Sequence, residues 1–310
     1  MSNPNFSYSD ESQPLLQRGI IRVIEKATGQ PRLEKLYLEN HYHPRADESF
    51  WQAAIRQLRL DLCVDEAQLQ AIPKTGPLVI IANHPYGVLD GLAICAIVER
   101  ARKDFRVLTH SALLRAPEAR PSLLPVDFSG TKEAFETNLN SREAARQLLA
   151  DGGCVIVFPA GAVSTSPDRL GRKAAIDWRW QPFTAQLIQR SGATVVPIFF
   201  DGQNSRLFQI ASHISATIRL SLIFKEVNDR IGTRLRAAIG APIHRDEIIQ
   251  FGDRKAMLDE LRRRTYALEA KLPISGADGT HSRRTKLGLR IKLLQRRARS
   301  VLKQYNPKAA

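Results

Sequence analysis

Cysteine is scarce in this sequence, and no long apolar segment runs through it. The three cysteines, Cys63, Cys95 and Cys154, lie in separate apolar runs and form no Cys-x-x-Cys pair. Neither a disulfide framework nor a cysteine zinc site therefore has support. The longest apolar stretch, residues 87–98, includes Asp90 and is shorter than the roughly 18 residues that would span a bilayer. We expect no transmembrane helix.

Signatures of several other protein classes are also missing. The sequence has no Gly-x-Ser-x-Gly elbow, which marks the serine of α/β-hydrolases, and no glycine-rich phosphate loop of the nucleotide-binding enzymes. Its histidines are not spaced with carboxylates or cysteines as metal ligands are, so we expect no metal site. Residues 1–11 lack the basic start and apolar core of a signal peptide.

What the sequence has in excess is positive charge. Of its 310 residues, 43% are apolar and 25% are charged, as in a soluble globular protein with a sizeable core. The 46 lysines and arginines outnumber the 31 acidic residues and give a net charge of +15. Residues 281–310 hold ten of these basic residues and no acid, so residues 1–280 keep 36 basic against 31 acidic residues, a net +5. Such an excess indicates an anionic partner, whether a nucleic acid, a membrane surface or a phosphorylated molecule.

The basic tail, residues 281–310, has the pattern of an amphipathic helix. Its apolar residues recur among the basic ones at roughly helical spacing, which is typical of a helix on an anionic bilayer. We therefore expect peripheral association with the cytoplasmic face of the inner membrane. Nucleic-acid binding is the alternative, but no helix-turn-helix, zinc-finger or aromatic RNA-binding signature accompanies the charge, so no nucleic-acid partner is expected. The apolar residues are Leu287, Leu289, Ile291, Leu294, Val301 and Leu302.

Short apolar runs alternate with helical patterns along the chain. Strands are expected at residues 77–82, 105–108, 154–158, 193–200 and 218–224. Helices are expected at residues 15–29, 50–60, 92–103, 132–150, 183–190 and 253–271. Fully apolar strands between helices predict an α/β fold with a mainly parallel central sheet flanked by helices.

The expected organisation has five parts. A Ser/Asn-rich start predicts disorder, and a run of Pro, Ser, Gly and Asp predicts a linker before the tail. The parts are a disordered N-terminus (1–12), an N-terminal helical segment (13–68), the α/β domain (69–272), the linker (273–280) and the basic amphipathic tail (281–310).

The most informative stretch is residues 83–91, Asn-His-Pro-Tyr-Gly-Val-Leu-Asp-Gly, which follows the first expected strand and precedes a helix. In open α/β sheets, sites form outside the carboxyl ends of the strands. Two interpretations stay open. A His84 ring that is oriented by the Asp90 carboxylate can remove a proton from a hydroxyl nucleophile. Alternatively, Asp90 is a helix N-cap and His84 is a loop residue bonded to backbone.

A second stretch, residues 155–164, also runs from a strand into a Pro/Gly turn. If the strands are parallel, both turns open at the same edge of the sheet. The backbone N–H groups of this turn either line a substrate pocket or merely end the strand.

Together these stretches resemble a known family, the glycerolipid and lysophospholipid acyltransferases. Residues 83–91 are similar to that family's His-and-Asp block, and residues 158–161 to its Phe-Pro-Glu-Gly block. Residues 195–200 resemble its late, proline-containing strand, and Arg115 falls where the family has a phosphate-contacting arginine. The blocks follow the family's order, so the resemblance is more specific than any single block.

Two departures from the family pattern bear on the substrate. Five residues separate His84 from Asp90 instead of the usual four, a form similar to the hemolysin-like branch that is related to lyso-ornithine-lipid acyltransferases. Ala160 stands where the family has glutamate, and no Thr-Arg follows Gly161. Because that block of the family helps to hold a glycerol-phosphate acceptor, the change disfavours such an acceptor and points to another lyso-lipid.

The resemblance implies that a fatty acyl group passes from acyl-CoA or acyl-carrier protein to the hydroxyl of a lyso-lipid, either a lysophospholipid or a lyso-ornithine lipid. No bound cofactor is implied. His84 would be the general base and Asp90 its orienting carboxylate, while backbone amides around Gly161 would stabilise the oxyanion. A catalytically inactive, lipid-binding member of the fold is the alternative.

Further residues take roles from the same resemblance. Trp178, Trp180 and Phe183 either line an acyl tunnel or belong to the core. The candidates for substrate binding are Asn83, Arg115, Phe158, Pro159, Ala160 and Gly161.

Overall fold

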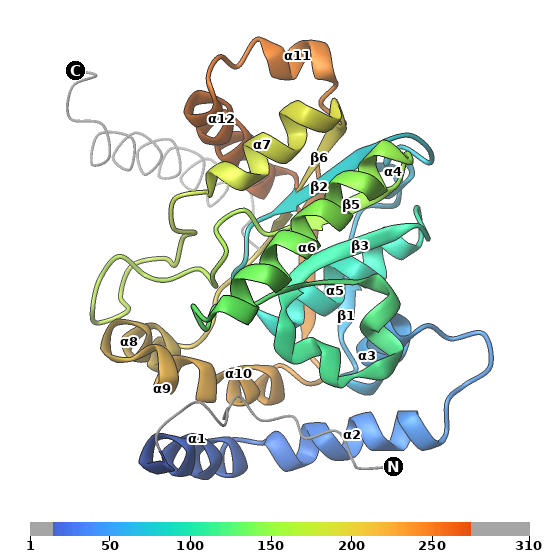
Figure 1. The fold of residues 1–310 in the computed structure, drawn as a ribbon. Coiled ribbons are helices and arrows are strands. Elements are labelled where there is room, and N and C mark those ends of the chain that lie inside the picture. Colours follow the sequence, from blue (N-terminus) through green and yellow to red (C-terminus); the bar gives the residue numbers. More distant parts are fainter. Residues whose placement is uncertain (1–14, 274–310) are drawn as a thin grey trace, which may run out of the picture. The chain divides into compact units, whose positions relative to one another are not determined.

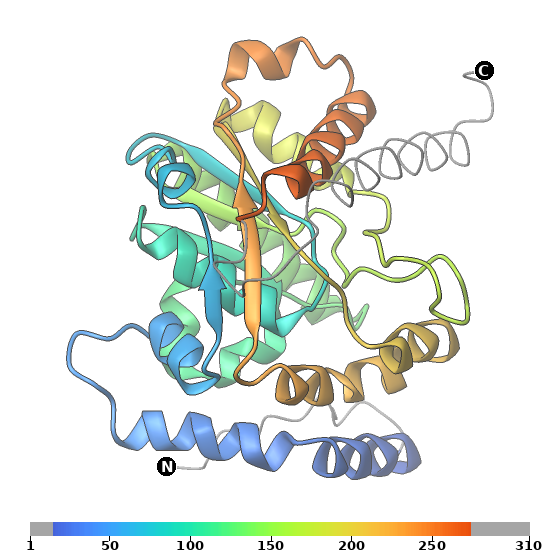
Figure 2. The same cartoon turned by 180° about the vertical axis from the view of Figure 1, so that it is seen from behind.

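One sheet forms the centre of the structure, a computed structural model that describes residues 15–273. Its strands are β1 (Asp61–Cys63), β2 (Leu78–Ala82), β3 (Phe105–His110), β4 (Leu123–Val126), β5 (Cys154–Val157), β6 (Thr194–Phe200) and β7 (Arg234–Ile239). They lie in the order β1-β7-β6-β2-β5-β3-β4 (Figures 1 and 2). Neighbouring strands are parallel except β6 and β7, which are antiparallel. The predicted mainly parallel sheet is confirmed.

Helices surround this sheet, as predicted. The first helices are α1 (Leu15–Ala27), α2 (Gln30–Tyr42), α3 (Phe50–Gln57), α4 (Glu66–Gln70), α5 (Val88–Glu99) and α6 (Lys132–Ala150). The later ones are α7 (Pro182–Ser191), α8 (Arg206–Ile214), α9 (Ala216–Ser221), α10 (Ile223–Asp229), α11 (Arg245–Ile249) and α12 (Arg254–Ala267). Short 3-10 helices are η1 (Ser111–Arg115), η2 (Pro117–Ser122) and η3 (Leu268–Lys271).

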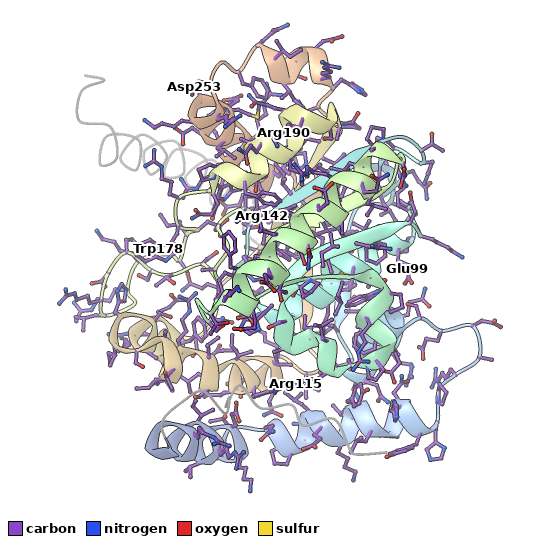
Figure 3. All side chains as sticks on the ribbon, viewed as in Figure 1. Glu99, Arg115, Arg142, Trp178, Arg190 and Asp253 are labelled. Atoms are coloured by element: carbon purple, nitrogen blue, oxygen red, sulfur yellow. The ribbon has the colours of Figure 1, made fainter. Side chains whose placement is uncertain are left out.

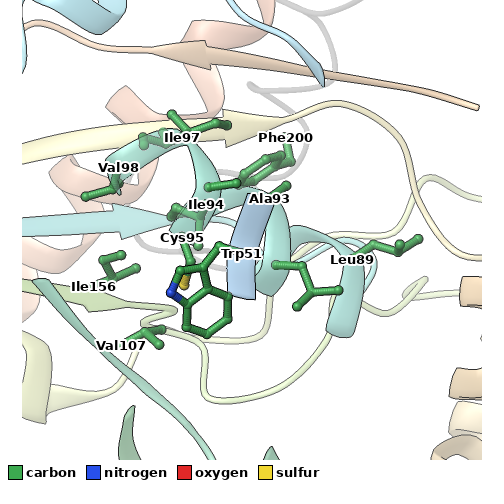
Figure 4. Close-up of a cluster of buried hydrophobic side chains, with 14 of the residues drawn as sticks. Trp51, Leu89, Ala93, Ile94, Cys95, Ile97, Val98, Val107, Ile156 and Phe200 are labelled. Atoms are coloured by element: carbon green, nitrogen blue, oxygen red, sulfur yellow. The ribbon is translucent and has the colours of Figure 1, made fainter. Parts of the chain in front are cut away.

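The alternating side chains of β2 supply both faces of the sheet, because successive residues of a strand point to opposite sides. Leu78 and Ile80 join a core cluster that also contains residues of α3, α5, α8 and α10. Val79 and Ile81 join a second cluster with residues of α6, α7, α11 and α12. Figure 4 shows part of the first cluster, where Trp51 of α3 lies among side chains of α5. Helices therefore cover the sheet on both faces.

The strand expected at residues 218–224 is wrong, because this segment spans the end of α9 and the start of α10. Ser215 caps α9 with its hydroxyl, which accepts from the N–H of Ile218. The apolar residues Ile223 and Val227 then lie one helical turn apart and pack into the first core cluster. A short apolar run does not distinguish a buried strand from a buried helix, and here the cap decides.

Three strands were not expected from the sequence. β1 and β4 are short and lie at the two edges of the sheet, so each carries little apolar pattern. β7 alternates exposed Arg234 and half-buried Arg236 with buried Leu235, which breaks the continuous apolar run that marked the other strands.

The predicted N-terminal helical segment, residues 13–68, includes α1, α2 and α3 and also the edge strand β1. The limits set for the α/β domain stay a prediction. Apart from Pro273, the predicted disordered start, linker and basic tail lie outside the described residues. Within residues 15–273, no helix combines the length and the apolarity that crossing a membrane requires.

Candidate active site

His84 and Asp90 come together just beyond the carboxyl end of β2. The His84 Nδ1 atom lies 3.0 Å from Asp90 Oδ1, and the Asp90 side chain is fully buried while His84 is 17% exposed. Neither of these two atoms has a hydrogen bond to any other described residue. The predicted pairing of the two side chains is thus seen in the structure, and their catalytic roles stay a prediction.

The turn between them fixes the position of Asp90. Gly87 has a φ of 84°, in the left-handed region that favours glycine, and it is the N-cap residue of α5. Asp90 then lies in the first turn of α5, and its Oδ2 accepts a 2.8 Å hydrogen bond from the N–H of Tyr86. With one oxygen held by backbone, the other is directed at the imidazole.

Tyr86, whose N–H bonds Asp90, also ties this turn to other parts of the chain. It is 2% exposed, and its hydroxyl donates to the backbone carbonyl of Asp201 over 2.9 Å. The guanidinium of Arg230 lies 4.4 Å from the centre of its ring. Asn204 donates to the Tyr86 carbonyl over 3.3 Å. Residues far along the chain therefore hold the segment between His84 and Asp90.

Asn83 connects β2 to β6 instead of facing open space. Its side-chain amide donates to the carbonyl of Phe200 over 2.9 Å, and its oxygen accepts from the N–H of Phe200 over 2.7 Å. Asn83 is 3% exposed. These contacts extend the pairing of the two strands up to His84, and the substrate-binding role expected for Asn83 stays a prediction.

The turn at residues 158–161 lies at the same edge, as expected, because β5 pairs with β2 in parallel. The ring of Phe158 stacks at 4.0 Å from the ring of His84, tilted by 32°. The N–H of Gly161 donates to the carbonyl of Phe158 over 3.0 Å, so this amide is occupied within the turn. The oxyanion role predicted for the backbone amides around Gly161 stays a prediction, and it concerns the amides next to that of Gly161.

Pro159 and Ala160 lie on the inner side of this turn. The carbonyl of Pro159 accepts from the N–H of Gln181 over 2.8 Å. Ala160 is 5% exposed and packs into the second core cluster, next to the sheet. Within this turn, it is the ring of Phe158 that stacks on His84. The substrate-binding roles expected for residues 158–161 stay predictions.

Arg115 ends η1, which follows β3 at the same edge of the sheet. Two steps in the strand order separate β3 from β2. Burial lowers the pKa of His110, the last residue of β3, the charge of Asp127 opposes this effect, and the charge of Arg115 adds a smaller lowering. Arg115 lies in the 3-10 helix that the His110 side chain caps, and its predicted contact with substrate stays a prediction (Figure 3).

Asp177 is a site residue that the sequence reasoning missed. It is 3% exposed, and its Oδ1 accepts from the backbone N–H of His84 over 3.1 Å and from the hydroxyl of Ser164 over 2.6 Å. Its Oδ2 accepts from the indole N–H of Trp180 over 3.0 Å. Burial raises the pKa of Asp177, and the hydrogen bonds it accepts offset part of this rise.

The loop between β5 and α7, which carries Asp177, binds both the N–H and the carbonyl of His84. Ser164 donates its N–H to the carbonyl of His84 over 2.7 Å, opposite the bond from His84 to Asp177. Asp177 is itself tied to α12, since its N–H donates to the hydroxyl of Tyr266 and its carbonyl accepts from Arg262. Nothing in the local pattern around Asp177 signals this role, because its partners are far away in sequence.

The three aromatic residues considered for an acyl tunnel differ in their burial. Trp180 is 3% exposed and belongs to the second core cluster. Phe183 packs against the same cluster, with the guanidinium of Arg142 5.0 Å from its ring centre. Trp178 is 60% exposed (Figure 3). Trp180 and Phe183 therefore belong to the core, whereas Trp178 is too exposed to belong to the core or to line an enclosed tunnel.

Comparison with known proteins identifies the family of this chain. The acyltransferase family matches residues 36–275, which is more than half of the chain. A lyso-glycine lipid O-acyltransferase of Phocaeicola vulgatus is 26% identical over 159 residues, which cover 50% of this chain and 53% of that protein. A lyso-glycine lipid O-acyltransferase of Bacteroides thetaiotaomicron is 27% identical over 156 residues, which cover 48% and 52%. The chain spans about half the length of the curated relatives it matches.

One solved structure also resembles the chain. It is the 1-acyl-sn-glycerophosphate (LPA) acyltransferase PlsC from Thermotoga maritima, with a TM-score of 0.44 and 18% identity over 82% of this chain and 81% of that one. The segment matched by the family, residues 36–275, contains the His84–Asp90 pair, the turn at residues 158–161 and the whole sheet. The chain belongs to the acyltransferase family.

Proposed function

We propose that this protein is an O-acyltransferase that moves a fatty acyl group from a thioester, acyl-CoA or acyl-carrier protein, to the hydroxyl of a lyso-lipid. Membership of the acyltransferase family supports the reaction class. The observation that carries the mechanism is the 3.0 Å contact between His84 Nδ1 and the buried Asp90 carboxylate. A carboxylate on Nδ1 fixes the tautomer in which Nε2 is free to take a proton.

In the proposed reaction, Nε2 of His84 removes the proton of the acceptor hydroxyl as its oxygen attacks the thioester carbonyl. The C–S bond of the tetrahedral intermediate then breaks, an ester forms, and the departing thiolate takes the proton back from His84. Asp90 stabilises the imidazolium between these two transfers. No covalent acyl-enzyme is needed, because the acceptor oxygen is itself the nucleophile.

We propose a lyso-amino-acid lipid as the acceptor, in preference to a lysophospholipid. Two relatives bear the name lyso-glycine lipid O-acyltransferase. Ala160, where the resembling family has glutamate, is buried and apolar, and it provides no charged group for a glycerol-phosphate acceptor. A lyso-lipid of this class presents a hydroxyl beside an amino-acid headgroup, which fits a reaction that needs only a hydroxyl and a base.

We also propose that the protein works at the cytoplasmic face of the inner membrane, where its basic tail, residues 281–310, binds anionic lipid. Sedimentation with vesicles that contain phosphatidylglycerol tests this for the full chain and for a chain that ends at residue 280. Loss of sedimentation on truncation supports the tail as an anchor, and unchanged sedimentation contradicts it.

The enzyme assay mixes the purified protein with a labelled acyl-CoA or acyl-carrier protein and with lyso-glycine lipid, lyso-ornithine lipid or lysophosphatidate in turn. Mass spectrometry of the lipid product reports the acceptor. We expect the diacylated amino-acid lipid to form, and His84→Ala to lower the rate of its formation by roughly 100-fold or more, as for loss of a general base. His244→Ala is the matched control, because His244 is exposed at the start of α11.

A rate that His84→Ala leaves unchanged contradicts the assignment of the base. A protein that binds the lyso-lipid but transfers no acyl group from either donor is instead the inactive, lipid-binding member of the fold. In the source organism, deletion of the gene should cause the natural acceptor to accumulate, and lipid analysis of that strain identifies it.

A further inference from the structure

The loop between β5 and α7, residues 158–181, is long for a connection that contains no helix. Loops beyond about 12–15 residues within a compact domain are usually either functional or disordered. Its residues Ser164 and Asp177 hold the backbone of His84. Residues 167–179, which include Asp177, are hereafter called the outer loop.

The outer loop has a defined conformation. Thr165 and Ile176 pair as an antiparallel bridge across its base. The N–H of Ala175 donates to the side chain of Gln203 over 2.7 Å. At the tip, Arg206 of α8 donates to the carbonyl of Leu170 over 2.8 Å. Side chains of the outer loop therefore project from a fixed backbone docked against α8 (Figure 1).

These projecting side chains combine large apolar groups with positive charge. Trp178 is 60% exposed and Leu170 is 46% exposed. Leu207, on the first turn of α8 next to the loop tip, is 51% exposed. The exposed basic residues of the outer loop are Arg169, Arg172, Lys173 and Arg179. Tryptophan with arginine and lysine is the composition that favours the boundary between lipid headgroups and acyl chains.

Acidic residues that would oppose an anionic surface are few in this region. Between Asp177 and Glu226 the sequence has one acid, Asp201, and it pairs with Arg236. Within the outer loop, Asp168 accepts from the backbone N–H of Arg172, and Asp177 is buried. The exposed charge of the outer loop is therefore predominantly positive.

We infer that the outer loop, together with the start of α8, is a docking surface for an anionic lipid bilayer. Trp178 and Leu170 insert at the headgroup boundary, while Arg172 and Lys173 contact lipid phosphates. Trp178 follows Asp177, which bonds the backbone of His84, so docking brings the bilayer beside the active site. The inference rests on the proposed function, because a lyso-lipid acceptor resides in the bilayer.

Tryptophan fluorescence can probe this surface without an added label. Its three tryptophans are Trp51, Trp178 and Trp180, and the first and last are 4% and 3% exposed. A change in tryptophan fluorescence on contact with lipid therefore reports mainly Trp178. With the full chain and vesicles of phosphatidylcholine and phosphatidylglycerol, we expect a blue shift, and quenching when the lipids carry bromine on their acyl chains. Trp178→Phe should abolish both changes while the protein still sediments with the vesicles.

Binding by the basic tail alone gives a different result. In that case the protein sediments with the vesicles, but its emission neither shifts nor is quenched by brominated lipid, and the inference is overturned. Equal shifts with pure phosphatidylcholine overturn the electrostatic part. Absence of any vesicle binding overturns the whole inference.

Charge variants give a second, independent readout. Arg172→Gln combined with Lys173→Gln should weaken binding to anionic vesicles by about fivefold for each charge that lies at the surface. Lys74→Gln combined with Lys103→Gln is the matched control, because these exposed lysines precede β2 and β3 at the opposite edge of the sheet. Equal effects of the two double variants overturn the placement of the surface.

Activity assays separate this inference from the proposed function. Trp178→Glu should lower turnover of a lyso-lipid embedded in vesicles by tenfold or more, on the order of the insertion cost of one charge, and leave turnover of a water-soluble, short-chain acceptor unchanged. Ile249→Glu, at an exposed apolar position on α11, is the control for adding a charge. If Trp178→Glu turns over both the embedded and the water-soluble acceptor as fast as the unmodified protein does, the docking surface is wrong and the enzyme assignment stands. If neither acceptor is turned over by the unmodified protein, the proposed function has failed.

Discussion

The carboxylate of Asp177 accepts a 3.1 Å hydrogen bond from the backbone N–H of His84, a residue 93 positions earlier in the chain. The β5–α7 loop therefore holds the backbone of His84, while Asp90 Oδ1 lies 3.0 Å from the Nδ1 atom of its ring. The two carboxylates act on different parts of one residue. Their contributions can be separated by mutation.

Asp177→Asn should lower the turnover rate by roughly 10- to 100-fold, because small displacements of a catalytic group carry large kinetic costs. An asparagine whose oxygen still accepts from His84 and Ser164 turns its NH2 group toward the indole N–H of Trp180, so two donors face each other. The free energy of unfolding should fall by about 1–3 kcal/mol. Steady-state kinetics and urea unfolding measure the two effects.

A positioning role for Asp177 has a distinct kinetic signature. We expect kcat to fall with little change in KM and with the same pH profile, since the proposed base is still His84. The matched control is Asp168→Asn in the same loop, where the carboxylate accepts from the backbone of Arg172 and is not buried. A change in KM alone contradicts positioning by Asp177. An equal fall of kcat in the Asp168→Asn control contradicts it as well.

Asn83→Ala should destabilise the protein by about 2–4 kcal/mol, because it leaves the N–H and the carbonyl of Phe200 buried without partners. The chain offers a close control. Asn138 makes the same two hydrogen bonds to the backbone of Asp127, at 2.8 Å each, but it is only half-buried. Water can replace its amide there, so Asn138→Ala should cost less than half as much. Thermal or urea unfolding of both variants makes the comparison.

Glu260 should give the folded state a pH-dependent stability. Hydrogen bonds from Arg263 and then Arg264 lower the pKa of its carboxyl to about 2, against the opposing effect of burial. Because the folded pKa lies below the unfolded one of about 4.5, this stabilisation is present above pH 4.5 and is lost as the pH falls toward 2. Glu260→Gln should therefore be less stable by roughly 0.5–1 kcal/mol at neutral pH.

Urea unfolding of Glu260→Gln and of the unmodified protein between pH 2 and pH 7 tests this sign. The difference in unfolding free energy should shrink toward zero at the acidic end. Glu143→Gln is the control, because Glu143 pairs with Arg146 on α6 while 62% exposed. A difference that grows as the pH falls would contradict the lowered pKa.

The part of the site that the sequence predicted is the local part. His84 and Asp90 lie on one strand–turn–helix unit, so their spacing and the buried strand before them were enough to bring them together. Phe158 could be placed beside them because parallel strands end at one edge of the sheet. Asp177 could not be found, because its partners come from β2, its own loop and α12, and no periodicity encodes such contacts.

The fold shows the same division. The fully apolar strands β2, β5 and β6 were predicted, since burial on both faces leaves a continuous apolar run. Residues 218–224 are also mostly apolar, although they include Arg219 and Ser221, and they form helix, with the Ser215 cap starting α9 just before them. A short, mostly apolar run was therefore not enough to separate a buried strand from a buried helix.

Gly202 should be the least replaceable glycine near the site. Its φ is 106°, and a Cβ built on it would lie 1.8 Å from the hydroxyl oxygen of Tyr86. Gly202→Ala must therefore displace Tyr86, whose N–H bonds Asp90, as well as strain the backbone. We expect a loss of at least about 2 kcal/mol in stability and a larger proportional loss of activity than any other Gly→Ala change outside the site.

Backbone strain and collision can be separated, because Gly232 has a φ of 77° and its surroundings leave at least 4 Å of open space around the position that a Cβ would take. Gly232→Ala should thus cost only the conformational strain, about 1 kcal/mol, and leave activity intact. Adding Tyr86→Phe to Gly202→Ala removes the oxygen that collides, although the ring carbon Cζ at 2.9 Å still crowds the new methyl group. The double variant should regain part of the lost stability, and this non-additivity measures the contact. If Gly202→Ala and Gly232→Ala cost the same, Tyr86 does not occupy the space above Gly202.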